Sequence, residues 1–222
     1  MTLMSTQQAA DRIGVSVRHV QRMVGSGDLV AIGTDRIDAD SVAQWMAQRE
    51  GSRARAWEEA TAWGAVALLE GEQSPWLGQA QRSRLRSTLT QLTADELVAR
   101  TRNRARLLRY RAHPRAGGHL IRALVPSGVG EGLGGLTPVV GRIDGYVARS
   151  ALLDLVIRYR MEIDPTGDLT LRETGMPMDV VEHLADGGRH VLAGLDLAGS
   201  TDTRERSAGR RLLDRALDRL RG

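Results

Sequence analysis

The sequence predicts a mainly helical α+β protein in three parts: an N-terminal winged helix-turn-helix at residues 1–50, a helical basic region at 51–116, and a small C-terminal α/β module at 117–222. Three observations support this. Two short amphipathic periods separated by a glycine open the chain, arginine is concentrated in its middle, and strand-like alternation precedes a long amphipathic segment at its end. Hydrophobic residues make up 41% of the chain, which is enough to build a core.

The first two helices are predicted from caps and apolar spacing. Ser5 or Thr6 can cap the first helix, Gly14 ends it, and Ser16 is placed to cap the second. The apolar residues recur at helical spacing, with Ala9, Ala10 and Ile13 in the first helix and Val17, Val20 and Val24 in the second.

Polar residues occupy the remaining face of the second helix, which is the pattern of a recognition helix. We expect Arg18, Gln21 and Arg22 to reach base edges, because arginine suits guanine and glutamine suits adenine. Phosphate contacts are expected from the helix cap and from a wing after the helix. The full predicted DNA-binding set is Ser16, Arg18, His19, Gln21, Arg22, Thr34 and Arg36.

The wing is predicted as two short strands, at residues 29–32 and 36–37, around Gly33-Thr34-Asp35. Asp40 or Ser41 can cap a third helix, which turns Val42, Trp45 and Met46 inward.

The order of these residues carries a family resemblance. The chain resembles the excisionase and MerR-type helix-turn-helix family in the order of five short motifs: A-A-x-x-x-G-V-S, x-V-x-R, G-x-L, R-I and V-x-x-W. The resemblance implies that the second helix enters the major groove and that the wing meets the DNA backbone. A three-helix module used only for protein contacts is the alternative. Pro75 rules out the long dimerising coil of MerR activators, which argues against a metal or drug sensor.

All basic residues are arginine, and the net charge of +4 is unevenly distributed. Residues 1–50 hold five arginines and six acidic residues, a net of −1, whereas residues 79–122 hold eleven arginines and two acidic residues, a net of +9. This block predicts a surface for DNA phosphate or an acidic protein, with a solvated face as the plain alternative. The arginines assigned to phosphate or partner contacts are Arg100, Arg102, Arg104, Arg106, Arg109 and Arg111.

The secondary structure of this block is open. Thr93 and Glu96 match a capping box, which favours a helix running to a point before Pro114. Arginine at every second position from Arg100 to Arg106 also suits one face of a strand, in which case residues 56–112 form a second winged helix.

The C-terminal module is predicted to hold a partner or to dimerise. We expect a strand at residues 145–147, a helix at 150–160, strands at 161–163 and 168–173, and a terminal helix at 200–220. In the helix at 150–160 the predicted inward residues are Leu152, Leu153, Val156 and Ile157.

The residues do not favour an enzyme or a bound cofactor. Gly130, Gly132 and Gly135 match G-x-G-x-x-G, but prolines flank them where a nucleotide site needs a strand and a helix. There is no cysteine, no G-x-S-x-G and no lysine for a phosphate loop. Glu182, His183 and His190 could be imagined around a metal, yet they lack the spacing of zinc hydrolases. We therefore expect no enzyme, no cofactor and no metal.

A second resemblance covers residues 100–215. The series RNRARLLRYRAHP, PSG, IDGYV, GDLTLRET and LDLAGSTDTRERSAGRRLL resembles actinobacterial antitoxins of the AbiEi type. That resemblance implies an autorepressor of a toxin–antitoxin operon with a nucleotidyltransferase-type toxin as partner, although this family usually has a different head.

These expectations combine into one function. We expect a cytoplasmic, sequence-specific transcriptional repressor whose partners are double-stranded DNA at its own promoter, a cognate toxin and a second copy of itself. The alternative is an excisionase-like architectural factor acting with a recombinase, although excisionases are little more than the head. The sequence has no run of about 18 apolar residues, so we expect no membrane span. The N-terminus lacks the basic and apolar regions of a secretion signal.

Overall fold

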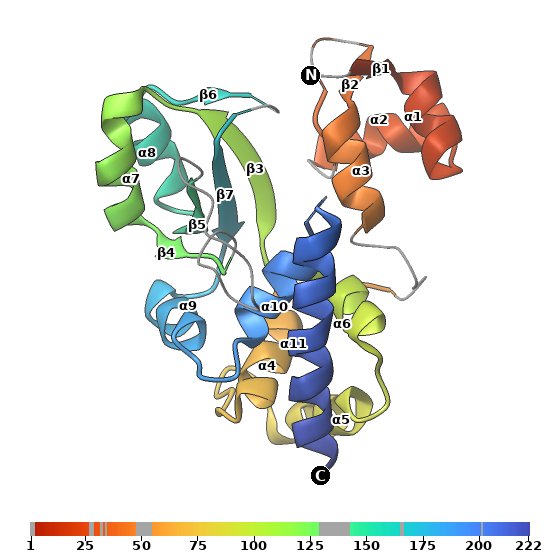
Figure 1. Ribbon diagram of the computed structural model, residues 1–222, viewed down its shortest axis with the longest axis vertical. Helices are drawn as coiled ribbons and strands as arrows, with labels where there is room; N and C mark the ends of the chain where they lie inside the picture. The colour runs from red at the N-terminus through yellow and green to blue at the C-terminus, as the bar shows by residue number, and fades with distance from the viewer. Residues whose placement is uncertain are drawn as a thin grey trace.

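The computed structural model describes residues 3–26, 29–31, 33, 35–47, 55–128, 143–164, 167–200 and 202–222. We call residues 3–47 the head and residues 55–222 the body (Figure 1). The head contains β1 (Leu3–Ser5), α1 (Thr6–Ile13), α2 (Val17–Ser26), β2 (Arg36–Asp38) and α3 (Ala39–Ala47). The α+β class predicted from the sequence is confirmed.

Local hydrogen bonds explain where the head helices begin and end. Ser5 caps α1, and its side chain and that of Gln8 form a reciprocal capping box. Gly14 ends α1 at φ 77°, a left-handed conformation that glycine adopts without steric cost. The third helix is capped by Asp38 and not by the predicted Asp40 or Ser41, since Asp38 Oδ2 accepts from the Ser41 backbone N–H at 2.9 Å.

The wing differs from the prediction. β2 pairs along its length with β1, in antiparallel register from Leu3↔Asp38 to Ser5↔Arg36. Ala31 makes only an isolated bridge to Ile37, so the first predicted wing strand is reduced to one position among the residues described. The reason is that Met4 is buried in the head core, which draws the N-terminal strand onto β2.

The body combines a helical layer with a five-stranded sheet. Its elements are α4 (Glu59–Glu70), α5 (Gln79–Leu89), α6 (Ala94–Thr101), β3 (Arg106–Arg111), α7 (Gly117–Ala123), β4 (Val125–Pro126), β5 (Ile143–Ala148), α8 (Leu152–Arg158), β6 (Glu162–Ile163), β7 (Leu169–Thr174), α9 (Met178–Ala185), α10 (Val191–Ala198) and α11 (Thr203–Arg221). The strand order is β4-β5-β7-β3-β6, with β5 and β7 parallel and the other neighbours antiparallel. Figure 1 shows α7 and α8 on one side of the sheet and the remaining helices gathered at its lower end.

α4 is the central helix of the body. Every residue from 62 to 70 is buried, and Trp63 packs edge-to-face on Tyr146 with 5.6 Å between ring centroids. Both ends of the helix are tied to later parts of the chain by a glutamate. Glu59 accepts from the Gly175 backbone N–H at 2.5 Å, and Glu70 accepts from the Val191 N–H at 2.6 Å, at the start of α10.

The arginine block is partly helix and partly strand. Thr93 caps α6 as predicted, but the helix stops at Thr101 and is followed by a short 3-10 turn, Arg102–Arg104. β3 then pairs with β7 and β6, so the predicted continuation of the helix is wrong and the strand alternative holds for residues 106–111. β3 is an inner strand of the body sheet and not a wing. One sheet therefore joins the predicted segments 51–116 and 117–222.

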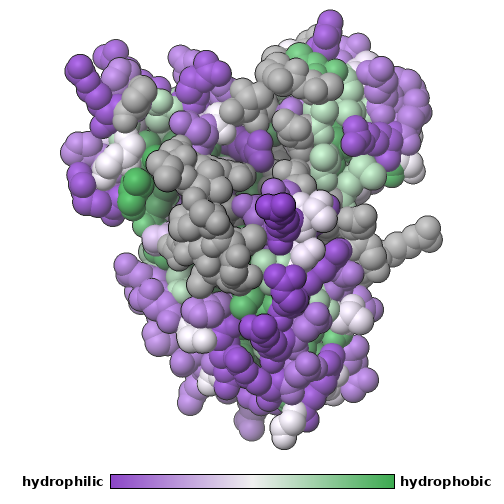
Figure 2. Space-filling model, viewed as in Figure 1, coloured by the Kyte–Doolittle hydropathy of each residue, from purple (hydrophilic) through white to green (hydrophobic). Residues whose placement is uncertain are grey.

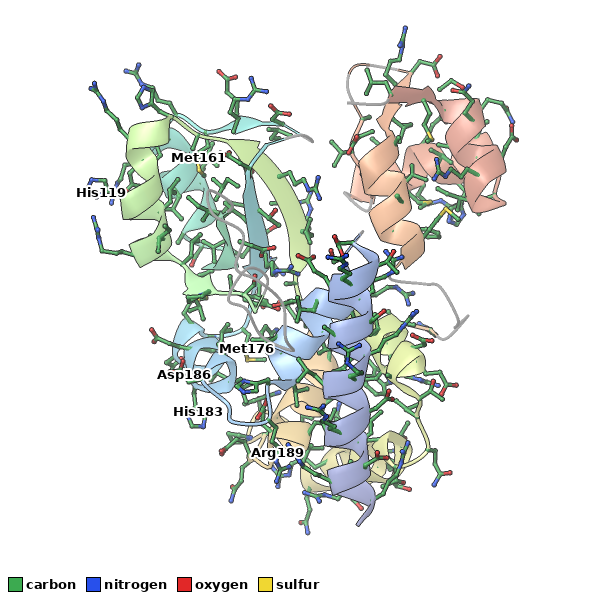
Figure 3. All side chains as sticks on the ribbon, viewed as in Figure 1. His119, Met161, Met176, His183, Asp186 and Arg189 are labelled. Atoms are coloured by element: carbon green, nitrogen blue, oxygen red, sulfur yellow. The ribbon has the colours of Figure 1, made fainter. Side chains whose placement is uncertain are left out.

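A second body core lies between the sheet and the pair α7–α8. Leu120, Leu155 and Met161 are buried there, and in Figure 3 Met161 lies on the inner side of this layer while His119 lies on the outer side of α7. Leu153 and Ile157 are exposed, contrary to the prediction that they face the core. The formal G-x-G-x-x-G match at Gly130, Gly132 and Gly135 lies outside the described residues.

Candidate nucleic-acid interface

One face of α2 is polar and open to solvent. The side chains of Arg18, Gln21 and Arg22 are exposed and together line one shallow, open hollow. Positions three and four apart lie on the same side of a helix, so the three side chains form a continuous donor-rich surface. His19, also predicted for this site, is half-buried beside them.

The opposite face of α2 fixes the helix to the head. Val20 is 0% exposed and Met23 is 4% exposed, and both pack with Ala9 and Ala10 of α1. Three residues, 14–16, join the two helices, and the Gly14 N–H donates to the Ala10 carbonyl at 2.9 Å. This short turn and the shared core set the angle at which the polar face of α2 is presented, as in helix-turn-helix domains.

Ser16 caps α2 as predicted. Its Oγ accepts from the His19 backbone N–H at 3.3 Å, while the residue itself is exposed. The hydroxyl proton is not used by this contact, so Ser16 can donate it to a phosphate oxygen at the start of the recognition helix.

Of the two wing residues predicted to contact phosphate, Arg36 and Thr34, the structure describes Arg36. Arg36 is exposed at the start of β2, where its backbone pairs with Ser5. Thr34 lies outside the described residues. The segment between them is held to α1, because Thr6 Oγ1 donates to Asp35 Oδ1 at 2.8 Å.

The arginines predicted for phosphate or partner contacts are not one continuous surface. Arg106 and Arg111 are exposed, and each faces a carboxylate, with Arg106 Nη1 3.8 Å from Glu173 and Arg111 paired with Asp164. Arg100, Arg102 and Arg109 are half-buried, and the Arg100 guanidinium lies 5.5 Å from the centre of the Trp57 ring.

Arg104 is buried, so its side chain does not contribute to an exposed surface. Its Nη2 lies 2.5 Å from Asp196 Oδ1, which also accepts from the Tyr146 hydroxyl at 2.7 Å and lies 3.1 Å from Arg172 Nη1. Arg172 in turn makes a two-bond contact with Asp144. This group, which we call the buried charge network, joins the 3-10 turn before β3 and the strands β5 and β7 to α10.

The buried charge network shifts the pKa values of its members. Burial alone would lower the pKa of Arg104, but the neighbouring Tyr146 and Asp196 outweigh it and hold that pKa above its usual value. Burial raises the pKa of Tyr146 well above its ordinary value, so its hydroxyl stays protonated and donates to Asp196. The buried charge network therefore has a structural role: it holds the sheet against α10. Sequence reasoning missed Asp196 and Tyr146, because only the fold brings residues so distant in sequence together.

The imagined metal site receives no support from the geometry. His183 lies on α9 with Nε2 3.5 Å from Glu72, and Figure 3 shows His183 and Asp186 together at one end of α9. His190 stands before α10 with a left-handed backbone, φ 56°. Among the described residues, no group of three or more histidine, aspartate or glutamate side chains is arranged to hold a metal ion.

The helices in the described part of the chain include none with the length and apolar character that a membrane span requires.

Comparison with known proteins agrees with the geometry of the head. The family model described as a helix-turn-helix domain matches residues 3–50, which include every helix and strand of the head. The predicted helix-turn-helix head is therefore confirmed, and the chain carries a DNA-binding domain at its N-terminus. No curated protein and no solved structure matches the chain. The resemblance of residues 100–215 to AbiEi-type antitoxins is not confirmed.

Proposed function

We propose that this protein is a sequence-specific transcriptional repressor that reads duplex DNA with α2. The observation that carries the proposal is the exposed face of Arg18, Gln21 and Arg22, which line one hollow on a helix whose other face is buried in a helix-turn-helix core. Arginine and glutamine in this arrangement match the donor and acceptor pattern of base edges in the major groove.

The proposed mechanism separates positioning from reading. Ser16 and Arg36 contact phosphates and set the register of the head on the duplex. The base contacts then come from α2, with arginine directed to guanine and Gln21 to adenine. Repression follows where a bound head covers the site that the transcription machinery needs.

The test begins with selection of binding sites from a random duplex library, using the full chain. Arg22→Ala is then compared with wild type on the selected site by fluorescence anisotropy. We expect Arg22→Ala to cost about 1–3 kcal/mol in binding and to relax the base preference at one position. Arg215→Ala, an exposed arginine on α11, serves as the matched control and should leave binding unchanged.

Two outcomes contradict the proposal. Selection that enriches no sequence would mean that the head does not read bases. A selected site bound equally well by wild type and Arg22→Ala would move the reading surface away from α2.

The narrower antitoxin role and the excisionase-like alternative need separate experiments. The antitoxin role is supported only by the sequence resemblance of residues 100–215, and co-expression with the neighbouring gene product decides it: a stable complex that silences a toxic neighbour supports it. An architectural factor would bend its site, which a circular-permutation gel shift measures. The large body at residues 55–222 favours the repressor, because DNA bending by a head needs no such unit.

A further inference from the structure

α8 has apolar residues on two sides but is buried on only one. Five of its seven residues are apolar, and Leu155 is 9% exposed in the core beneath the helix. Leu153 and Ile157, one turn apart, are 66% and 67% exposed. A surface helix normally places polar residues on its outer face, so this outer stripe is an unpartnered apolar face.

The same layer carries further exposed apolar residues. Ile163 on the edge strand β6 is 70% exposed, and it stands opposite Tyr110, whose side chain is in the core under α7 and α8. Directly opposed residues point to the same face of a sheet, so Ile163 lies on the side of α8. Four of the five large apolar side chains exposed in the described part of the chain belong to this layer: Ile121, Leu153, Ile157 and Ile163. Figure 2 shows apolar surface where α7 leads into β4 and mostly hydrophilic surface along α11. Apolar exposure of this kind marks an interaction site.

The charges beside the stripe select the partner. Asp154 and Arg158 each follow a stripe residue by one position, and each residue in a helix is rotated by about 100° from the last, so both charges lie on the same flank of α8. Both are exposed, and neither makes an ion pair within the residues that the structure describes. A two-fold axis perpendicular to α8 packs the helix antiparallel against its own copy and keeps this flank on the same side of both helices. Each Asp154 then faces the Arg158 of the other copy.

We propose that the occupant of this surface is a second copy of the chain, packed through Leu153 and Ile157 of α8 with reciprocal Asp154–Arg158 pairs. An acidic or a basic foreign partner would favour charges of one sign beside the stripe, whereas the flank carries one of each. The need for a dimer comes from the proposed function, since one head covers one half-site and tight operators place two half-sites about one helical turn apart.

The experiment is sedimentation equilibrium of the full chain without DNA, over about 1–100 µM, the range in which dissociation constants of weak to moderate dimers fall. The variants are Asp154→Arg, Arg158→Asp, the two combined, and Leu153→Gln with Ile157→Gln. Asp214→Arg, at an exposed position on α11, is the matched control for a charge reversal elsewhere. Circular dichroism confirms that each variant is folded.

We expect wild type and the control to dimerise equally. Each single reversal should raise the dimer dissociation constant by about 10-fold or more, because like charges then meet twice in the two-fold interface. The combined reversal should return it to within about threefold of wild type, since opposite charges face each other again. The glutamine pair should leave a monomer.

Three results overturn the proposal: a monomeric wild type over the whole range, a dimer that the single reversals do not weaken, or a weakened dimer that the combined reversal does not restore. None of these results bears on base reading, which is measured separately on the selected site. Failure of the dimer and failure of the proposed function are therefore distinguishable.

Discussion

Arg104 and Asp196 are 92 positions apart in sequence, and their side chains meet with 2.5 Å between Nη2 and Oδ1. Arg104 lies in the 3-10 turn before β3, and Asp196 lies in α10, so this buried pair joins the sheet to the helical layer. Asp196 is the acceptor shared by Arg104, Arg172 and Tyr146, which makes it the residue on which the buried charge network depends.

Asp196→Asn should destabilise the body by about 3–5 kcal/mol, because removing one partner leaves buried guanidinium groups without their shared counter-charge. The asparagine can also put its Nδ2 donor in the place of Oδ2, an atom that is buried without a hydrogen-bond partner among the described residues. Urea unfolding followed by circular dichroism measures the change in free energy. Asp214→Asn on exposed α11 is the control, and equal stability of the two variants would show that the pair contributes nothing to the fold.

Gly209→Ala should loosen the contact between α10 and α11. A Cβ at Gly209 would lie 2.3 Å from the Ala198 backbone nitrogen and 2.5 Å from the Gly194 carbonyl oxygen, so the helices must separate. Such overpacking costs about 1–3 kcal/mol. The thermal midpoint of the body reports it. Gly188→Ala has open space around the added Cβ and should unfold near the wild-type temperature; an equal loss in both variants would contradict the packing argument.

The start of α11 should make stability depend on pH in the acid range. Asp202 accepts backbone N–H bonds from Glu205 and Arg204, and these bonds hold the pKa of its carboxyl below the ordinary value. A pKa that is lower in the folded state gives stability that is complete above the unfolded pKa of about 3.9 and is lost as pH falls through the folded value.

Asp202→Asn isolates this contribution, because asparagine caps a helix without titrating. As pH falls below about 4, the unfolding free energy of wild type should decrease relative to that of Asp202→Asn. Urea titration at each pH measures both free energies. Asp214→Asn, further along the same helix, provides the comparison. A difference that stays constant with pH would show that Asp202 does not titrate with folding.

The sequence predicted the head well because its determinants are local. Ser5, Gly14 and Ser16 fix the ends of α1 and α2 through bonds to residues within five positions, and the valine spacing of α2 fixes which side faces outward. Contacts at longer range were missed. No local sequence pattern predicts that β1 pairs with β2, because the register of this pair depends on where Met4 is buried.

The body shows the same limit more strongly. The capping box of Thr93 correctly predicts the start of α6, but Arg106–Arg111 becomes a strand because β7, which is distant in sequence, offers it a partner. An arginine in the alternating run cannot be recognised as buried until its carboxylate partner on α10 is known. The apolar spacing within residues 150–160 predicts four inward side chains, whereas the structure buries only one side of α8 and leaves Leu153 and Ile157 exposed.

The position of α4 in the chain has a consequence for biosynthesis. The core of the head is complete within residues 4–45, so the head can fold while the ribosome is still making the body. α4 has no polar face, and the core around it closes only on Leu213, Ala216 and Leu217 of α11. From the emergence of Trp63 until residue 217 has also emerged from the ribosome, this apolar helix lacks its final cover. A nascent chain stalled in that interval would present a finished DNA-binding head beside exposed apolar side chains of α4, which promote aggregation.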